Sequence, residues 1–163
     1  MLLAEGQRVS QTGSFYWRPD TDEIRSSEEL YRILALEPGS AVTLGRVAGR
    51  VHPEDLPLLN DEIAQARAGS TDLDFEMRLR MPDESLKYVR TSAYGTRDRN
   101  GQLEYVGAVQ DLTERIRSEE ALAAVRSELA YITRVASMGA LTAQSRTKSI
   151  SRYPASSRMP ARA

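Results

Sequence analysis

The chain offers little of the chemistry that histidine and cysteine side chains provide. Its 163 residues include one histidine, His52, and no cysteine. One imidazole could bind haem iron or accept a phosphoryl group, but a protein zinc site needs several ligands. His52 precedes Pro53, Glu54 and Asp55, residues that are favoured in the first turn of a helix. We therefore interpret His52 as structural and expect no metal site, no disulfide and no thiol catalysis.

Motifs of enzyme active sites are also missing from the sequence. There is no glycine-rich nucleotide loop and no nucleophile elbow. The net charge is −1, so no global field favours nucleic acid or a membrane surface. No run approaches the ~18 apolar residues of a membrane helix. The absence of cysteine suits the cytoplasm. The sequence therefore predicts a non-catalytic cytoplasmic module without a membrane segment or a nucleic-acid partner.

Aromatic side chains are the candidates for a small-ligand pocket. They also commonly form the hydrophobic core, and the sequence leaves both uses open. The candidates are Trp17, Phe75, Tyr88 and Tyr105.

The elements that must position these residues follow from apolar periodicity and turn residues. Residues 13–17 and 23–26 read as strands, and Ser26 or Ser27 is suited to cap the helix that follows. A helical or irregular stretch over 44–51 precedes a helix over 53–68. Strands at 73–81, 86–94 and 103–110 come next, with an Asn100-Gly101 hairpin before the last. This order predicts an α+β domain with a five-stranded antiparallel sheet and helices on one face.

Asp111 and Thr113 lie where the last predicted strand is followed by a helix. The first N–H groups of a helix lack partners within it, and Asp and Thr side chains are favoured acceptors for them. We predict that one of these two side chains caps the helix.

Several of these segments together resemble the PAS family. The resemblance covers about residues 10–115 and implies a PAS sensor domain, which we place at residues 11–113. It implies that the aromatic candidates surround a ligand cavity, and that Asp111 and Thr113 couple the sheet to the next helix. Cysteinyl-flavin chemistry is excluded because cysteine is absent, haem is not expected because no histidine lies in the long helix, and the cofactor is left open. The segments are Gly13-Ser14-Phe15-Tyr16-Trp17, Val51-His52-Pro53-Glu54-Asp55, the Asn100-Gly101 hairpin, and the PAC-type motif over residues 106–115.

After the predicted domain, apolar residues repeat every seven positions. This spacing is typical of a coiled coil, so we predict a signalling helix over residues 114–143 that forms a homodimer. The alternative is an amphipathic helix that packs back on the sheet. The predicted dimer contacts are Leu122, Val125, Leu129 and Ile132.

Residues 135–143 resemble the first helix of a histidine kinase dimerisation domain, just before its phospho-accepting histidine. Residues 144–163 then hold five basic and no acidic residues, against 17 basic and 23 acidic in the rest. If the third base of each codon is read with the first two of the next, codons 146–153 can encode His-Glu-Ile-Asn-Gln-Pro-Leu, the usual kinase continuation. We predict a frameshift near residues 143–146 and a disordered basic tail over 144–163. A natural basic tail is the alternative.

The sequence as a whole predicts the signal-sensing PAS module of a bacterial two-component sensor histidine kinase, truncated at the start of its dimerisation domain. Lacking the phospho-acceptor and an ATP-binding domain, this chain is predicted not to be an enzyme. One alternative is a fragment of an active ATP-dependent kinase of a phosphorelay. The other is a stand-alone PAS regulator that pairs with full-length histidine kinases. Residues 1–10 are predicted as a helical lead-in, with further residues expected upstream.

Overall fold

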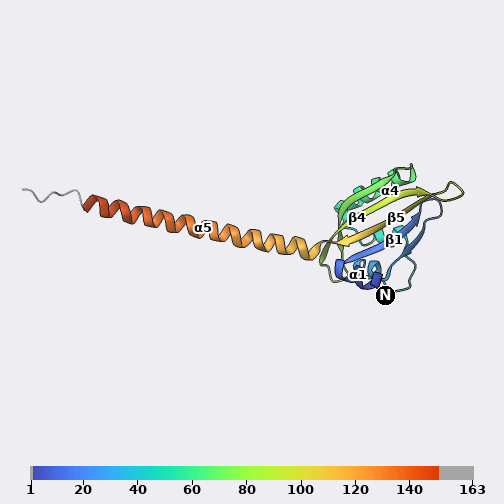
Figure 1. Ribbon diagram of the computed structural model, residues 1–163, viewed down its shortest axis with the longest axis horizontal. Coiled ribbons are helices and arrows are strands. Elements are labelled where there is room, and N and C mark those ends of the chain that lie inside the picture. The colour runs from blue at the N-terminus through green and yellow to red at the C-terminus, as the bar shows by residue number, and fades with distance from the viewer. Residues whose placement is uncertain (1, 151–163) are drawn as a thin grey trace, which may run out of the picture. The chain divides into compact units, whose positions relative to one another are not determined.

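The computed structural model describes the backbone of residues 2–150 and the side chains of residues 3–139. The chain divides into a unit of residues 1–117 and a unit of residues 118–163. Within the first unit the predicted order of helices and strands is confirmed (Figure 1). The elements are α1 (Leu2–Ser10), β1 (Thr12–Arg18), β2 (Glu23–Ser26), α2 (Glu28–Ile33), α3 (Leu44–Ala48), the 3-10 helix η1 (Pro53–Asp55), α4 (Leu56–Arg67), β3 (Asp72–Arg80), β4 (Leu86–Arg97), β5 (Leu103–Asp111) and α5 (Thr113–Ile150).

The five strands form one antiparallel sheet in the order β2-β1-β5-β4-β3, so the first hairpin lies beside the last strand. Strand β5 is hydrogen-bonded on both sides, with Gly107 opposite Phe15 of β1 and Ala93 of β4. The predicted α+β class and the five-stranded antiparallel sheet are confirmed.

One face of the sheet packs on the helices and forms the core. Burial alternates along β3 and β4, as expected for strands with one covered face. Leu79, Val89 and Tyr105 are the largest fully buried side chains. Helix α2 lies directly on β1: a Cβ atom on Gly13 would be 2.6 Å from the Cα atom of Leu30. The absence of a side chain at position 13 therefore allows this close approach.

Two local predictions need correction. Ser27 precedes α2 but makes no capping hydrogen bond, because its hydroxyl oxygen accepts the backbone N–H of Ser14 at 2.9 Å and ties the helix start to β1. Helix α5 continues past residue 143 to Ile150, so residues 144–150 are helical and not part of a disordered tail. These seven positions contain no proline or glycine, and Pro154 is the first helix breaker after them. Residues 151–163 lie outside the described residues.

Of the helices described in residues 2–150, none combines the length and apolar character needed to cross a bilayer.

Candidate functional site

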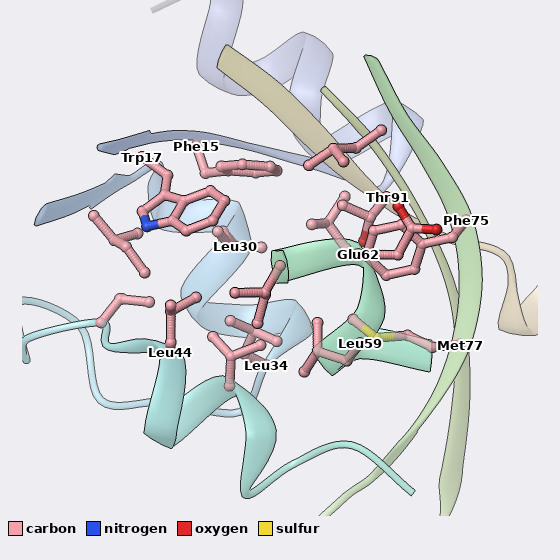
Figure 2. Close-up of a pocket in the computed structure, with 16 residues that line it drawn as sticks. Phe15, Trp17, Leu30, Leu34, Leu44, Leu59, Glu62, Phe75, Met77 and Thr91 are labelled. Carbon is pink, nitrogen blue, oxygen red and sulfur yellow. The ribbon is translucent and has the colours of Figure 1, made fainter. Parts of the chain in front are cut away.

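A small cavity of about 90 Å³ lies between the covered face of the sheet and helices α2, α3 and α4 (Figure 2). Its walls come from all five strands and from these three helices, and they are almost entirely apolar. The lining residues used below are Phe15, Trp17, Glu62, Phe75, Thr91 and Val109.

The four aromatic candidates occupy three different environments. Trp17 and Phe75 line the cavity. Tyr105 lies behind Trp17, with ring centroids 5.6 Å apart, and it is fully buried. Its hydroxyl group donates to the carbonyl oxygens of Ala66 and Ser70, and burial raises the pKa of the phenol. Tyr105 therefore anchors the C-terminal end of α4 to the sheet.

Tyr88 does not line the cavity, and its expected place there is wrong. Its neighbours Val89 and Thr91 belong to the buried set of β4, and alternate residues of a strand face opposite sides of the sheet. Tyr88 lines a different surface pocket, together with Asp55, Arg78 and Leu112.

Two buried polar atoms at the cavity lack a hydrogen-bond partner among the described residues. They are Nε1 of Trp17 and Oγ1 of Thr91, in side chains that are 4% and 6% exposed. Figure 2 shows Trp17 on one side of the cavity and Thr91 with Glu62 on the other. Sequence reasoning missed Thr91 and Glu62. The alternation of β4 could have identified Thr91. Val89, Thr91 and Ala93 are alternate residues on the buried face of the strand, so the hydroxyl group of Thr91 lies among apolar side chains.

The cavity does not fit the cofactors most often considered for such a fold. At about 90 Å³ it is smaller than the roughly 150 Å³ that holds one benzene ring, so a haem or a flavin would require large rearrangements. Its lining residues include no histidine for haem iron and no lysine or arginine for a propionate or phosphate group.

His52 has the structural role expected of it. It stands at the N-cap of η1, where its Nδ1 atom accepts the backbone N–H of Glu54 at 3.3 Å. Its backbone N–H donates to the carbonyl oxygen of Arg78, which ties the start of η1 to β3. Within the described part of the chain, no group of three or more His, Cys, Asp or Glu residues is placed to hold a metal ion.

An ion-pair network continues this connection between η1 and β3. Asp55 accepts the backbone N–H of Arg78 at 2.8 Å and two guanidinium hydrogen bonds at 2.9 and 2.7 Å. Glu54 accepts a further one at 2.9 Å. The side-chain hydrogen bonds from Arg78 lower the pKa of Asp55, and burial opposes this only in part. The ionised carboxylate therefore stabilises the fold.

We predict that the stability contributed by this network is lost in acid. The pKa of Asp55 is lower in the folded state, so its contribution is complete above the ordinary carboxyl pKa and disappears as pH falls through the folded value. Arg78→Met should lower the urea concentration at the midpoint of unfolding at neutral pH, because Asp55 loses its side-chain partner. The difference from the wild type should shrink between about pH 5 and pH 2 in urea titrations. Arg80→Met, at an exposed position of the same strand, is the control; an equal loss there would contradict the prediction.

Asp111 and Thr113 form a joint between the sheet and α5. The carboxylate of Asp111 accepts the backbone N–H of Thr113 at 2.9 Å and its hydroxyl group at 2.5 Å. The hydroxyl oxygen of Thr113 accepts the backbone N–H of Tyr88 at 3.0 Å, and the N–H of Leu112 donates to the carbonyl oxygen of Tyr88 at 2.7 Å. The β4–β5 pairing ends at Val89 and Asp111, so these bonds extend the ladder by one position into the helix.

Neighbouring side chains attach the joint to the rest of the first unit. Lys87 lies 3.8 Å from the Asp111 carboxylate. The backbone carbonyl oxygen of Gln11 accepts a hydrogen bond from the N–H of Asp111, and the side-chain amide of Gln11 donates to Glu114 at 3.2 Å. Arg117 donates to the carbonyl oxygen of Leu86 at 3.3 Å. The first turn of α5 is therefore bonded to β4 and to the α1–β1 connection.

Beyond residue 118, α5 exposes the apolar residues that recur every seven positions. Each of these residues is between 50% and 57% exposed, so together they leave an apolar stripe of this helix open to solvent. The four are Leu122, Val125, Leu129 and Ile132.

A model of the family described as PAS fold matches residues 23–109. No curated protein sequence matches the chain. Among solved structures, a sensory box histidine kinase/response regulator from Burkholderia thailandensis E264 is 22% identical, with a TM-score of 0.57, and the alignment covers 79% of this chain and 98% of that one. The N-terminal domain of a diguanylate cyclase with PAS/PAC sensor from Marinobacter aquaeolei is 20% identical, with a TM-score of 0.57 and coverage of 64% and 97%. At these identities the structural matches show a shared fold.

Proposed function

Because this chain belongs to the PAS fold family, we propose that it is the signal-sensing module of a bacterial two-component sensor histidine kinase. In this proposal the chain is a cytoplasmic, non-catalytic homodimer. The cavity receives the signal, and the Asp111–Thr113 joint relays it to α5. The observation that carries the proposal is the joint, in which one threonine hydroxyl group bonds the backbone of β4 to the first turn of the helix.

The relay has a short path through two paired strands. Thr91 and Val109 line the cavity and are opposite each other in the β4–β5 register. Tyr88 of the joint lies three residues before Thr91 in β4, and Asp111 lies two residues after Val109 in β5. A change in the spacing of β4 and β5 at the cavity therefore acts directly on the joint. The ligand must bind two states of this joint with different affinity to move it.

We propose that a second copy of this chain covers the apolar stripe of α5. Leu122 and Leu129 occupy a positions and Val125 and Ile132 occupy d positions, and charged residues flank them. Two such helices in parallel register would bury the stripe that one helix leaves exposed.

Cysteine cross-linking tests this dimer in a chain that has no cysteine of its own. In a parallel dimer the two d positions approach closely enough for a disulfide, which needs a Cα–Cα distance of about 4.4–6.8 Å. Val125→Cys should form disulfide-linked dimers under mild oxidation. Ser127→Cys lies two residues further along the helix, at a position that faces away from the partner, and should form few such dimers. Equal yields from both variants would rule out this register.

The kinase parentage is tested separately, by sequencing the genomic locus across codons 140–165 and beyond. The notable local feature is that residues 135–143, which resemble the start of a kinase dimerisation domain, belong to the continuous helix α5. A shifted frame that continues into an ATP-binding domain would make this chain the sensor part of a kinase. A stop codon without kinase sequence beyond it would favour the stand-alone regulator.

A further inference from the structure

The cavity has a feature that its apolar lining does not explain, namely the unpaired hydroxyl group of Thr91. A buried polar group without a partner is costly, and few occur in a folded domain. Thr91 is 6% exposed, its Oγ1 atom has no partner among the described residues, and it lines the cavity. A ligand in this cavity is therefore well placed to supply the missing hydrogen bond.

Charge narrows the class of that ligand. Among the described lining residues Glu62 carries the single charge, and within the described part of the chain it forms no ion pair. A carboxylate or phosphate ligand would meet a negative charge in an apolar site. A cation would have to leave water for one half-buried carboxylate, and such an exchange often costs more than the pairing returns. An uncharged ligand avoids both costs.

Size narrows the class further. The cavity of about 90 Å³ is well below the roughly 150 Å³ that holds benzene, so the ligand has only a few heavy atoms. Most of its surface must be apolar, because the walls are formed by residues such as Phe15, Trp17 and Phe75.

From these observations we propose that the cavity binds a short-chain aliphatic alcohol. Its hydroxyl group accepts a hydrogen bond from Thr91 and donates one to Glu62, which Figure 2 shows on the same side of the cavity. Its hydrocarbon chain lies among the aromatic and aliphatic side chains. This inference rests on the proposed function in one respect, that the cavity is where the signal binds.

The single tryptophan of the chain makes the proposal measurable, because Trp17 lines the cavity. The indole N–H resonance and the fluorescence of the full chain are titrated with four probes of similar size: 1-butanol, methyl propyl ether, butylammonium and butyrate. We expect saturable shifts with 1-butanol and binding about fivefold to tenfold weaker with the ether, which accepts but does not donate. The two ions should give no saturation. Tighter binding of either ion, equal binding of the ether, or no saturation with any probe would overturn the alcohol assignment.

Variants test whether the spectroscopic shifts depend on the hydroxyl group of Thr91. Thr91→Val should weaken the binding of 1-butanol and of the ether by similar factors of about fivefold to tenfold, because the oxygen atoms of both ligands accept a hydrogen bond from Thr91. Thr91→Ser keeps the hydroxyl group and should retain binding, so it covers the case in which the valine variant misfolds. Thr96→Val makes the same change at an exposed position of β4 and should have no effect. Unchanged 1-butanol binding in Thr91→Val would overturn the proposal.

The same titration separates this inference from the proposed relay. Cross-linking of Val125→Cys is measured with and without saturating 1-butanol. Binding without a change in cross-linking yield would support the ligand class and contradict the relay. Failure of all four probes would reject the ligand class, and the relay would then be judged by substitutions at the joint alone.

Discussion

Gly107→Ala is expected to lower the free energy of unfolding of the PAS domain by roughly 3 kcal/mol, at the upper end of the usual cost of overpacking. Gly107 lies in β5, between Phe15 of β1 and Ala93 of β4. A Cβ atom there would clash with the carbonyl oxygen of Ser92 and would lie 2.6 Å from the Cβ atom of Ala93. Because β5 is hydrogen-bonded on both sides, it cannot move away from β4 without disturbing its pairing with β1.

Urea unfolding monitored by the fluorescence of Trp17 would measure this loss. The matched control is Gly6→Ala in α1, where a Cβ atom would meet nothing within 4 Å. Alanine favours a helix over glycine by about 0.5–1 kcal/mol, so the control should be neutral or slightly stabilising. A loss below roughly 1 kcal/mol for Gly107→Ala would mean that the β4–β5 spacing relaxes more easily than close packing of the sheet implies.

The strands and helices of the domain were predictable because local signals for them are strong. Strand β3 alternates apolar and polar residues without interruption, and Asn100-Gly101 marks the hairpin between β4 and β5. The strand order was not predictable in the same way. The pairing of β1 with β5 joins residues about ninety positions apart, such as Phe15 and Gly107, and no local pattern encodes it.

The lining of the cavity was only partly predictable for a related reason. In β4 the sequence around Tyr88 mixes aromatic, aliphatic and polar residues, so its inward face is not evident until the register is known. If the inward-facing positions of β4 are displaced by one residue, Val89 faces the core in place of Tyr88, and Thr91 faces the core with it. Composition favoured the large aromatic residue as the ligand contact, whereas the geometry favours a small hydroxyl group that composition does not single out.

Thr113→Val is expected to remove the threonine hydroxyl's bonds between α5 and β4 while leaving the cavity intact. Thr113 is buried, and its hydroxyl group both donates to Asp111 and accepts the N–H of Tyr88. Valine has the same shape but offers neither bond, so the Tyr88 N–H loses its acceptor. We expect the free energy of unfolding to fall by about 1–3 kcal/mol and the Tyr88 amide to exchange with solvent at least about tenfold faster. Thr96→Val, at an exposed position of the same strand, should change neither quantity.

Asp111→Ala removes the other half of the joint and separates capping from relay. It takes away the acceptor for the Thr113 N–H, which should cost about 1 kcal/mol, but it leaves the bond from Tyr88 to Thr113 available. If that bond carries the signal, ligand-dependent cross-linking through Val125→Cys should be lost in Thr113→Val and weakened in Asp111→Ala. If the cross-linking response survives in both variants, the connection must run through the continuous backbone from β5 into α5. The joint would then hold the helix in place without transmitting the signal.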